Sequence, residues 1–368
     1  MPGPDPPHAS VLGSAVSRRA VLGGAAAAAL GVAMGTAAMA TSSAATPGER
    51  PNAPAGRPPS LALPGKIVKV SKANTLQPNG LWPTQEAARL MLERAMLELT
   101  GKADLAAAFA CFVGPADRVA IKANGIAGRH GATMATNKEL LAEIARGVVA
   151  AGVPPASILV YEQFRSFLVG ARVVDRTGAL DPAFPAGVRT AFHDNTDATT
   201  DVVYVCGVPT RYVRQLTDAT AVINVSLFKD HSICGYTGCL KNMTHGSIIN
   251  PGAFHDHLAS PQIAEIYARG AIKNRVVLHV ADVFKLIYEG GPLDRNPERR
   301  IPQEAVYVST DPVALDVIGW AEVDRLRRDK GLPSLKSAGR EPSYIRIAAE
   351  LGLGVFALDQ IHLREVKL

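Results

Sequence analysis

The sequence predicts an α/β protein in which a mostly parallel sheet carries helices on both faces. Short runs rich in Val and Ile alternate with helix-like segments along the chain. One strand–helix–strand unit spans residues 118–161, an arrangement typical of parallel strands joined by a right-handed crossover. The 368 residues are 47% hydrophobic and 20% charged, which suffices for a sizeable core.

The elements follow in chain order. Thr84 opens a first helix, whose apolar residues recur at helical spacing until Gly101. A strand at residues 118–122 leads into a Gly-rich loop. Thr136 and Glu139 then have the spacing of a capping box that opens a helix ending near residue 151, and a strand follows at 157–161.

The rest of the chain repeats this alternation without an internal sequence repeat. Ser260 before Pro261, and Asp311 before Pro312, each match an N-cap followed by a proline in the first helical turn. The sequence therefore predicts a single main domain over residues 64–368. Its further strands are expected at 201–206, 220–225, 275–280, 305–309 and 360–366, and its further helices at 261–269, 312–329 and 343–351.

The first 40 residues have the pattern of an export signal. Arg18 and Arg19 precede an uncharged run rich in Ala and Gly that ends in small residues at Ala40. The paired arginines favour the twin-arginine route, so we expect the export machinery of that route as a partner and a periplasmic or extracellular protein. The apolar run is long enough to be a membrane anchor instead. Because Ala and Gly are only weakly apolar, cleavage is favoured, and no stable membrane span is expected afterwards.

Residues 41–63 are rich in Ser, Ala, Pro and Gly and are predicted to be a disordered linker. The net charge of +6 and the isoelectric point of about 9.2 come without a block of Lys or Arg. Only 5% of the residues are aromatic. This combination gives no support for a nucleic-acid partner.

Four cysteines bear on cofactors and redox state: Cys111, Cys206, Cys234 and Cys239. An oxidising compartment would allow up to two disulfides. The spacing of Cys234 and Cys239 fits neither an iron–sulfur cluster nor a zinc ribbon. A short-loop disulfide and two buried thiols both remain open for this pair.

Polar residues follow several predicted strands. Lys122 and Asn124 come at the end of the strand at 118–122, Asn224 and Lys229 follow a second strand, and Asp282 follows a third. In open α/β sheets the ligand crevice lies beyond the carboxyl ends of the strands. We therefore expect these side chains to converge on one site, although each taken singly also fits a loop or solvent role.

A second cluster contains four of the nine histidines: His231, His245, His255 and His257. Imidazole is a common metal ligand and also the usual acid or base near neutral pH. His255 and His257 can face one ion only from an extended turn, and no complete metal motif such as HExxH is present. A loop whose histidines bond to the backbone is the alternative.

Three lysines, Lys122, Lys229 and Lys241, give the same crevice an anion-binding character. A phosphate, a carboxylate or a nucleotide-type cofactor would suit them. Neither a GxGxxG motif nor a Walker lysine motif is present, so no named nucleotide-binding fold is indicated.

Together these segments resemble a known family. The motifs are VAIKAN at 119–124, VINV at 222–225, TGCLKN at 237–242, GGP at 290–292 and STDPVALD at 309–316. They resemble the bacterial and archaeal family called domain of unknown function 362, in its twin-arginine-exported form, over roughly residues 66–320. The residues that match the family motifs are Lys122, Asn124, Asn224, Lys229, His231, Lys241, Asn242, one of His255 and His257, Asp282, Asp311 and Asp316.

The resemblance implies no settled reaction. Many relatives carry a ferredoxin-like segment, but this chain lacks the CxxCxxC ligands, so no iron–sulfur cluster of ferredoxin type is expected. The family usually has Pro where Ala123 stands, which loosens the loop but leaves its polar neighbours in place.

Our hypothesis from the sequence is an exported enzyme, redox or metal-assisted, that holds a cofactor or metal ion and acts on a small anionic substrate. A non-catalytic extracytoplasmic protein that binds a small anion is the rival. The expected catalytic residues are His231, Lys241, His245 and Asp282; the expected cofactor-binding residues are Lys122, Asn124, Asn224, Lys229 and Asn242; and the expected metal ligands are His245, His255 and His257.

Overall fold

The computed structural model describes residues 60–128 and 134–368. The predicted signal at residues 1–40 and the predicted linker up to residue 59 lie outside the described residues. The end of that linker makes backbone contacts: the N–H of Leu61 donates to the carbonyl of Cys111 (3.1 Å), and that of Leu63 to the Thr310 hydroxyl (2.8 Å). Residues 61 and 63, which belong to the predicted linker, thus bond to the domain. None of the described helices has the length and apolar character needed to span a membrane.

The described residues form a mixed, mostly parallel sheet, as the sequence predicted. Its strands are β1 (Lys66–Ser71), β2 (Val119–Lys122), β3 (Ile158–Glu162), β4 (Arg189–Phe192), β7 (Ala221–Ser226), β10 (Val276–Ile287), β11 (Arg300–Ser309) and β12 (His362–Lys367). Their order is β12-β1-β11-β10-β7-β2-β3-β4. Strands β10, β7, β2, β3 and β4 run parallel, whereas β11 is antiparallel to both of its neighbours.

Two short strands extend this sheet at the end of β10, and two others form a separate hairpin. Strand β8 (Lys229–His231) pairs with the end of β10 and with β9 (Gly235–Thr237). The strand predicted at residues 201–206 is β5 (Val203–Val205). It pairs with β6 (Val208–Thr210) and not with the main sheet, so its predicted place in that sheet is wrong.

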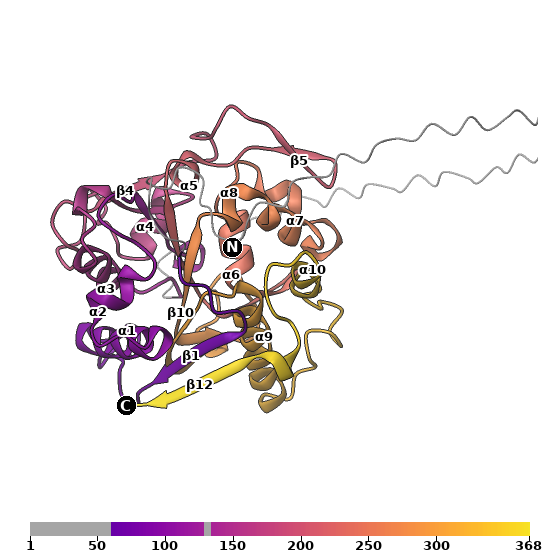
Figure 1. Cartoon of the computed structure of the whole chain (residues 1–368). Helices are drawn as coiled ribbons and strands as arrows, with labels where there is room; N and C mark the ends of the chain where they lie inside the picture. Colours follow the sequence, from indigo (N-terminus) through magenta and orange to yellow (C-terminus); the bar gives the residue numbers. More distant parts are fainter. Residues whose placement is uncertain (1–59, 129–133) are drawn as a thin grey trace, which may run out of the picture. The chain divides into compact units, whose positions relative to one another are not determined.

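Helices cover both faces of the sheet (Figure 1). The α-helices are α1 (Gln85–Thr100), α2 (Leu105–Ala110), α3 (Lys138–Ala150), α4 (Arg165–Gly170), α5 (Arg214–Thr217), α6 (Cys239–His245), α7 (Gln262–Ala268), α8 (Gly270–Lys273), α9 (Pro312–Asp329) and α10 (Tyr344–Glu350). One apolar core packs α1, α2 and α3 against the sheet, and a second packs α6, α7, α9 and α10 against the opposite face.

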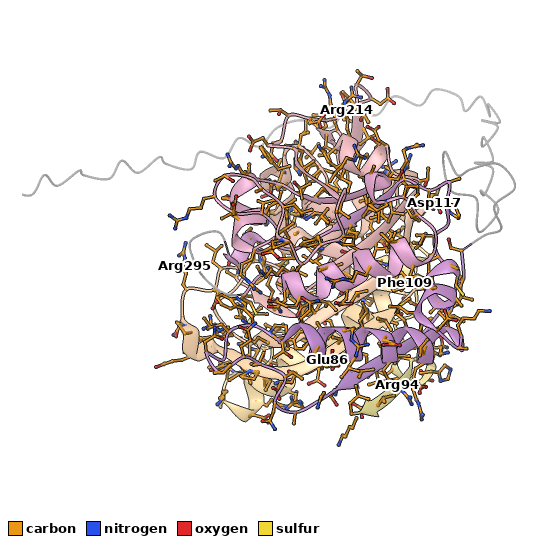
Figure 2. All side chains as sticks on the ribbon, turned by 90° about the vertical axis from the view of Figure 1, so that its left-hand side faces the viewer. Glu86, Arg94, Phe109, Asp117, Arg214 and Arg295 are labelled. Atoms are coloured by element: carbon orange, nitrogen blue, oxygen red, sulfur yellow. The ribbon has the colours of Figure 1, made fainter. Side chains whose placement is uncertain are left out.

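Figure 2 looks onto the first of these layers, with Glu86 and Arg94 on α1 and Phe109 on α2. Close packing here depends on a glycine in α3. A Cβ atom on Gly147 would collide with the ring of Phe109, so only glycine lets the two helices approach this closely.

Short 3₁₀ turns join several of these elements. They lie at Ile126–Gly128, Pro155–Ser157, Pro251–Phe254, Asp256–Ala259, Pro297–Arg299 and Leu358–Gln360. Two of them, Pro251–Phe254 and Asp256–Ala259, carry His255 between α6 and α7.

Two of the predicted helix caps are wrong. The N-cap of α3 is Asn137, because the hydroxyl of Thr136 is engaged with the backbone N–H of Asn124 (2.8 Å). The N-cap of α7 is Pro261, and the Ser260 side chain makes no cap bond. The cap predicted for α9 is confirmed: the Asp311 carboxylate accepts from the N–H of Ala314 (2.9 Å).

All four cysteines are free. Cys234 and Cys239 are buried, and their thiols lie 3.2 Å from the carbonyl of Tyr236 and the hydroxyl of Ser226, respectively. The interpretation as two buried thiols is therefore confirmed, and the short-loop disulfide is wrong.

Candidate functional site

A pocket of about 340 Å³ lies beyond the carboxyl ends of β2 and β3. Strands β8 and β9, helix α6 and the turns after it complete its wall. Eight of the residues predicted for the site line it: Lys122, Asn124, Lys229, His231, Lys241, Asn242, His245 and His255. The carboxyl ends of the parallel strands β2 and β7 bring Lys122, Asn124 and strand β8 to one edge of the sheet, and α6 with the turn after it adds the remaining residues.

Three residues predicted for the site do not line the pocket. Asn224 is buried beneath it, and its side-chain carbonyl accepts from the Asn242 amide (2.7 Å). His257 is exposed. Asp282 is fully buried, and its carboxylate accepts from the N–H (2.6 Å) and the side-chain amide (3.0 Å) of Asn137. Asp282 thus holds the start of α3.

Glu162, at the end of β3, is a polar residue that follows a predicted strand but was given no specific role in the sequence hypothesis. Its carboxylate lies 2.9 Å from the ammonium of Lys122 and accepts from the N–H of Gly125 (2.7 Å). Both members of this ion pair are almost fully buried and line the pocket. The rule that polar residues follow strand ends also marks Glu162, which directly follows the strand predicted at 157–161.

The pocket is rich in cationic side chains. Lys122, Lys229 and Lys241 line it, and Glu162 is the one carboxylate among the lining residues that the structure describes. Burial lowers the pKa of Lys122, an effect that Glu162 opposes. Burial lowers the pKa of Lys229 to about 7, and the ammonium of Lys122 adds to this effect. A bound anion would relieve this mutual repulsion.

A one-way chain of hydrogen bonds fixes Lys229. Its ammonium donates to the Asn124 carbonyl oxygen (2.7 Å), and the Asn124 amide donates to Asn242 (3.0 Å). The Asn242 amide donates in turn to Asn224, whose amide lies 3.0 Å from Nδ1 of His279. Each asparagine uses both ends of its side chain, so none can rotate without breaking two bonds.

The hydrogen bonds around His231 assign its tautomer. Nδ1 accepts from the backbone N–H groups of Ile233 (3.1 Å) and Cys234 (3.3 Å), so it carries no proton. The proton of the neutral ring is therefore on Nε2, which lies 2.7 Å from Nζ of Lys241. Burial lowers the pKa of His231, which favours this neutral ring.

This tautomer determines the state of Lys241. An N–H donor at 2.7 Å needs a lone pair on Nζ, which only the neutral amine has. On the other side, Nζ lies 3.3 Å from Nε2 of His255, whose Nδ1–H donates to the carbonyl of Pro251 (3.0 Å). The amine therefore accepts from His231 and donates to His255. Burial lowers the pKa of Lys241, in agreement with this state.

Asp316 of α9 positions the helix that carries Lys241. Its carboxylate accepts from the N–H groups of Cys239 (2.5 Å) and Leu240 (3.0 Å), at the start of α6. Asp316 is fully buried, and burial raises its pKa to about 7. The family motif at 309–316 thus supplies a support for the site and not a member of its lining.

The three residues predicted as metal ligands are not brought together. His245 and His255 have ring centroids 4.7 Å apart, but His257 is exposed and does not line the pocket. Nε2 of His245 is bonded to the Phe254 carbonyl (3.0 Å). Within residues 60–128 and 134–368, no group of three His, Cys, Asp or Glu side chains has an arrangement that could hold a metal ion.

A structural role for Asp282 gives a testable pH dependence. Burial raises its pKa from 3.8 to about 6. Between these two pH values the Asp282 carboxyl therefore keeps its proton in the folded state and has lost it in the unfolded state. The contribution of Asp282 to stability therefore falls as the pH rises from 4 to 6, by about 3 kcal/mol, and stays constant above. We expect the difference in unfolding free energy between the native protein and Asp282→Asn to change by about 3 kcal/mol between pH 4 and 6, as measured by thermal unfolding. A flat difference would contradict it.

The fold and this pocket define an α/β protein with a lysine-lined pocket at the carboxyl edge of its sheet. The chain belongs to the family described as domain of unknown function (DUF362), whose sequence pattern matches residues 119–321, more than half of the chain. Every residue that lines the pocket falls in that range. The predicted family is thereby confirmed, whereas its twin-arginine-exported form stays a prediction.

Two solved structures are distantly similar. The lactate racemase apoprotein from Thermoanaerobacterium thermosaccharolyticum is 11% identical, with a TM-score of 0.33, over 67% of this chain and 55% of that one. A Thermotoga maritima protein is 12% identical, also with a TM-score of 0.33, over 60% and 53%. The chain thus spans about half the length of either protein, and a likeness this weak says nothing about activity. No curated protein sequence matches the chain.

Proposed function

We propose that this protein is an enzyme that binds a small anionic substrate and transfers protons to and from it, with the neutral amine of Lys241 as the base. The observation that carries the proposal is the His231–Lys241–His255 arrangement, which holds an unprotonated amine between two imidazoles in a pocket. A base must be unprotonated at the pH at which it works, and burial favours the unprotonated amine because it lowers the pKa of Lys241.

The ligand class follows from the charges of the pocket. Because Lys241 is neutral, the ammonium groups of Lys122 and Lys229 face the single carboxylate among the described lining residues, so a small anion gains more electrostatic stabilisation there than a neutral molecule does. Lys122 is already paired with Glu162, which leaves Lys229 as the cation best placed to hold the anion. A pocket of about 340 Å³ accommodates a small carboxylate or phosphorylated compound and no macromolecule.

Binding and proton transfer are tested separately. We expect carboxylates or phosphorylated compounds to raise the melting temperature, and at least one of them to exchange C–H protons for deuterium in D₂O, seen by NMR. Binding without exchange for every ligand would instead favour the rival hypothesis, a binding protein without catalysis. If no anion in the panel raises the melting temperature, both hypotheses fail.

The pH dependence of anion binding is a further prediction. Below pH 7 Lys229 already carries its proton, so the affinity should be constant. Above pH 7, where its pKa lies in the free pocket, binding must take up a proton, and the affinity should fall by about tenfold per pH unit. Titration calorimetry from pH 6 to 9 measures this. Lys229→Arg, which stays charged, is the matched variant and should give a flat profile.

We also propose that the protein is exported by the twin-arginine route and acts outside the cytoplasm, as residues 1–40 indicate. Cell fractionation and the N-terminal sequence of the mature protein test this. Replacing Arg18 and Arg19 by lysine should keep the protein in the cytoplasm, whereas an unchanged location would contradict the route.

A metal ion is a separate hypothesis, drawn from the histidines in the sequence. Elemental analysis of protein from its native host, before and after chelation, tests it. Loss of proton exchange on chelation would show that Lys241 does not act alone.

A further inference from the structure

The geometry points to Lys241 as a nucleophile that forms an imine with the carbonyl group of a small 2-oxo carboxylate. This inference rests on the proposed function and names its substrate class. It starts from the amine itself. A neutral primary amine held in a pocket is a base, but it is also the nucleophile that condenses with aldehydes and ketones.

Of the three lysines of the pocket, the contacts single out Lys241. Nζ of Lys122 is committed to the Glu162 carboxylate (2.9 Å) and the Ala123 carbonyl (2.8 Å). Nζ of Lys229 donates to the side-chain carbonyl oxygen of Asn124 (2.7 Å), an acceptor that suits the ammonium form of the lysine. Only Lys241 has an N–H donor directed at its nitrogen, which requires the lone pair that a nucleophile uses.

The two imidazoles supply the proton transfers that imine formation needs. When the Lys241 lone pair attacks the carbonyl carbon, Nε2–H of His231 loses its acceptor and can hydrogen-bond to the developing oxyanion. Nε2 of His255, which accepts from Nζ in the resting site (3.3 Å), takes the protons that the nitrogen sheds.

Imine formation is a condensation. The C–N bond forms, the C–O bond breaks, and both amine protons leave with the carbonyl oxygen as water, carried one at a time by His255. No atom is oxidised or reduced, so no further reactant is needed. Once protonated, the imine acidifies the neighbouring C–H group. Lys241 then no longer has an amine that can act as the base, so with this substrate His255 takes the C–H proton and Lys241 promotes the proton exchange as the imine.

The carboxylate of the substrate is assigned to Lys229. Lys229 and Lys241 both line the pocket. A 2-oxo carboxylate carries its carbonyl next to its carboxylate, so it can hold one group against each lysine. A carbonyl compound without the anion would lack the contact to Lys229 and should bind more weakly.

The test is reductive trapping in the wild-type protein, with pyruvate, glyoxylate and 2-oxoglutarate as probes and cyanoborohydride as the reductant. We expect one adduct per chain, located by peptide mass spectrometry at Lys241. Acetone and propionate are the matched controls, since each lacks one of the two groups, and neither should label the protein. Lys241→Arg should prevent labelling while the probes still raise the melting temperature.

Each result decides a different point. Probes that raise the melting temperature through Lys229 but leave Lys241 unlabelled overturn the imine and leave the proposed anion site intact. Labelling at Lys229, or equally at surface lysines, also overturns it. If none of the probes binds, the substrate class is wrong, while thermal shifts with other anions would still support the proposed function.

Discussion

Lys241→Met should retain anion binding and lose proton exchange by at least about 100-fold, the scale that a positioned base contributes. Methionine fills a similar volume in the buried site but has no lone pair that can take up a proton. Lys229 still carries the charge that holds the anion, so the dissociation constant should change only a few-fold. The loss would be measured as the rate of deuterium incorporation at saturating ligand.

Lys241→Arg separates the two roles that a lysine can have. Arginine places a permanent cation at this position because it does not deprotonate in proteins, so it should be as inactive as methionine if the amine is the base. Lys273→Met, an exposed lysine on α8, is the control and should retain full activity. An active Lys241→Arg protein would show that Lys241 acts by its charge, and the proposed role would be wrong.

Much of this site could be predicted because it depends on topology. The strands at 118–122 and 220–225 were recognisable from their apolar runs, and parallel strands bring the residues after their ends to one edge. Lys122, Asn124 and Lys229 were placed together on that ground alone. The histidines of α6 and the following turns were found because their residue type is rare outside functional or structural contacts.

The place of Asp282 inside a strand could not be predicted from the sequence. The strand at 275–280 was ended before Asp282 because a carboxylate and then Lys285 break an apolar run. In the structure β10 continues to Ile287, and both residues are buried within it. The carboxylate is tolerated there because Asn137, which is 145 residues away in sequence, donates to it. No local pattern shows a partner at that distance.

The chemical state of the site was equally beyond the sequence. A histidine in a loop can be a ligand, a base or a donor to the backbone, and residue type does not distinguish these. His231 was assigned only by two backbone N–H groups directed at Nδ1, and the neutral state of Lys241 follows from that assignment. The loop geometry had to be known before the proton could be placed.

Asp316→Ala is expected to have the largest effect on folding, because it leaves the buried N–H groups of Cys239 and Leu240 without an acceptor. A buried donor without a partner costs about 1–3 kcal/mol, so we expect a loss of about 4 kcal/mol in unfolding free energy. Denaturant unfolding followed by circular dichroism measures it. Because α6 carries Lys241, the variant should also lose proton exchange in whatever fraction remains folded.

Two matched variants locate the cause. Asp316→Asn keeps one side-chain acceptor and should lose about half as much stability as the alanine variant. Asp329→Ala removes an exposed carboxylate of the same helix, paired only with Arg325 (2.9 Å), and should cost less than about 1 kcal/mol. If Asp316→Ala were no less stable than Asp329→Ala, the start of α6 would not depend on this carboxylate. The support of Lys241 would then have to come from the packing of α6 against α7 and α9.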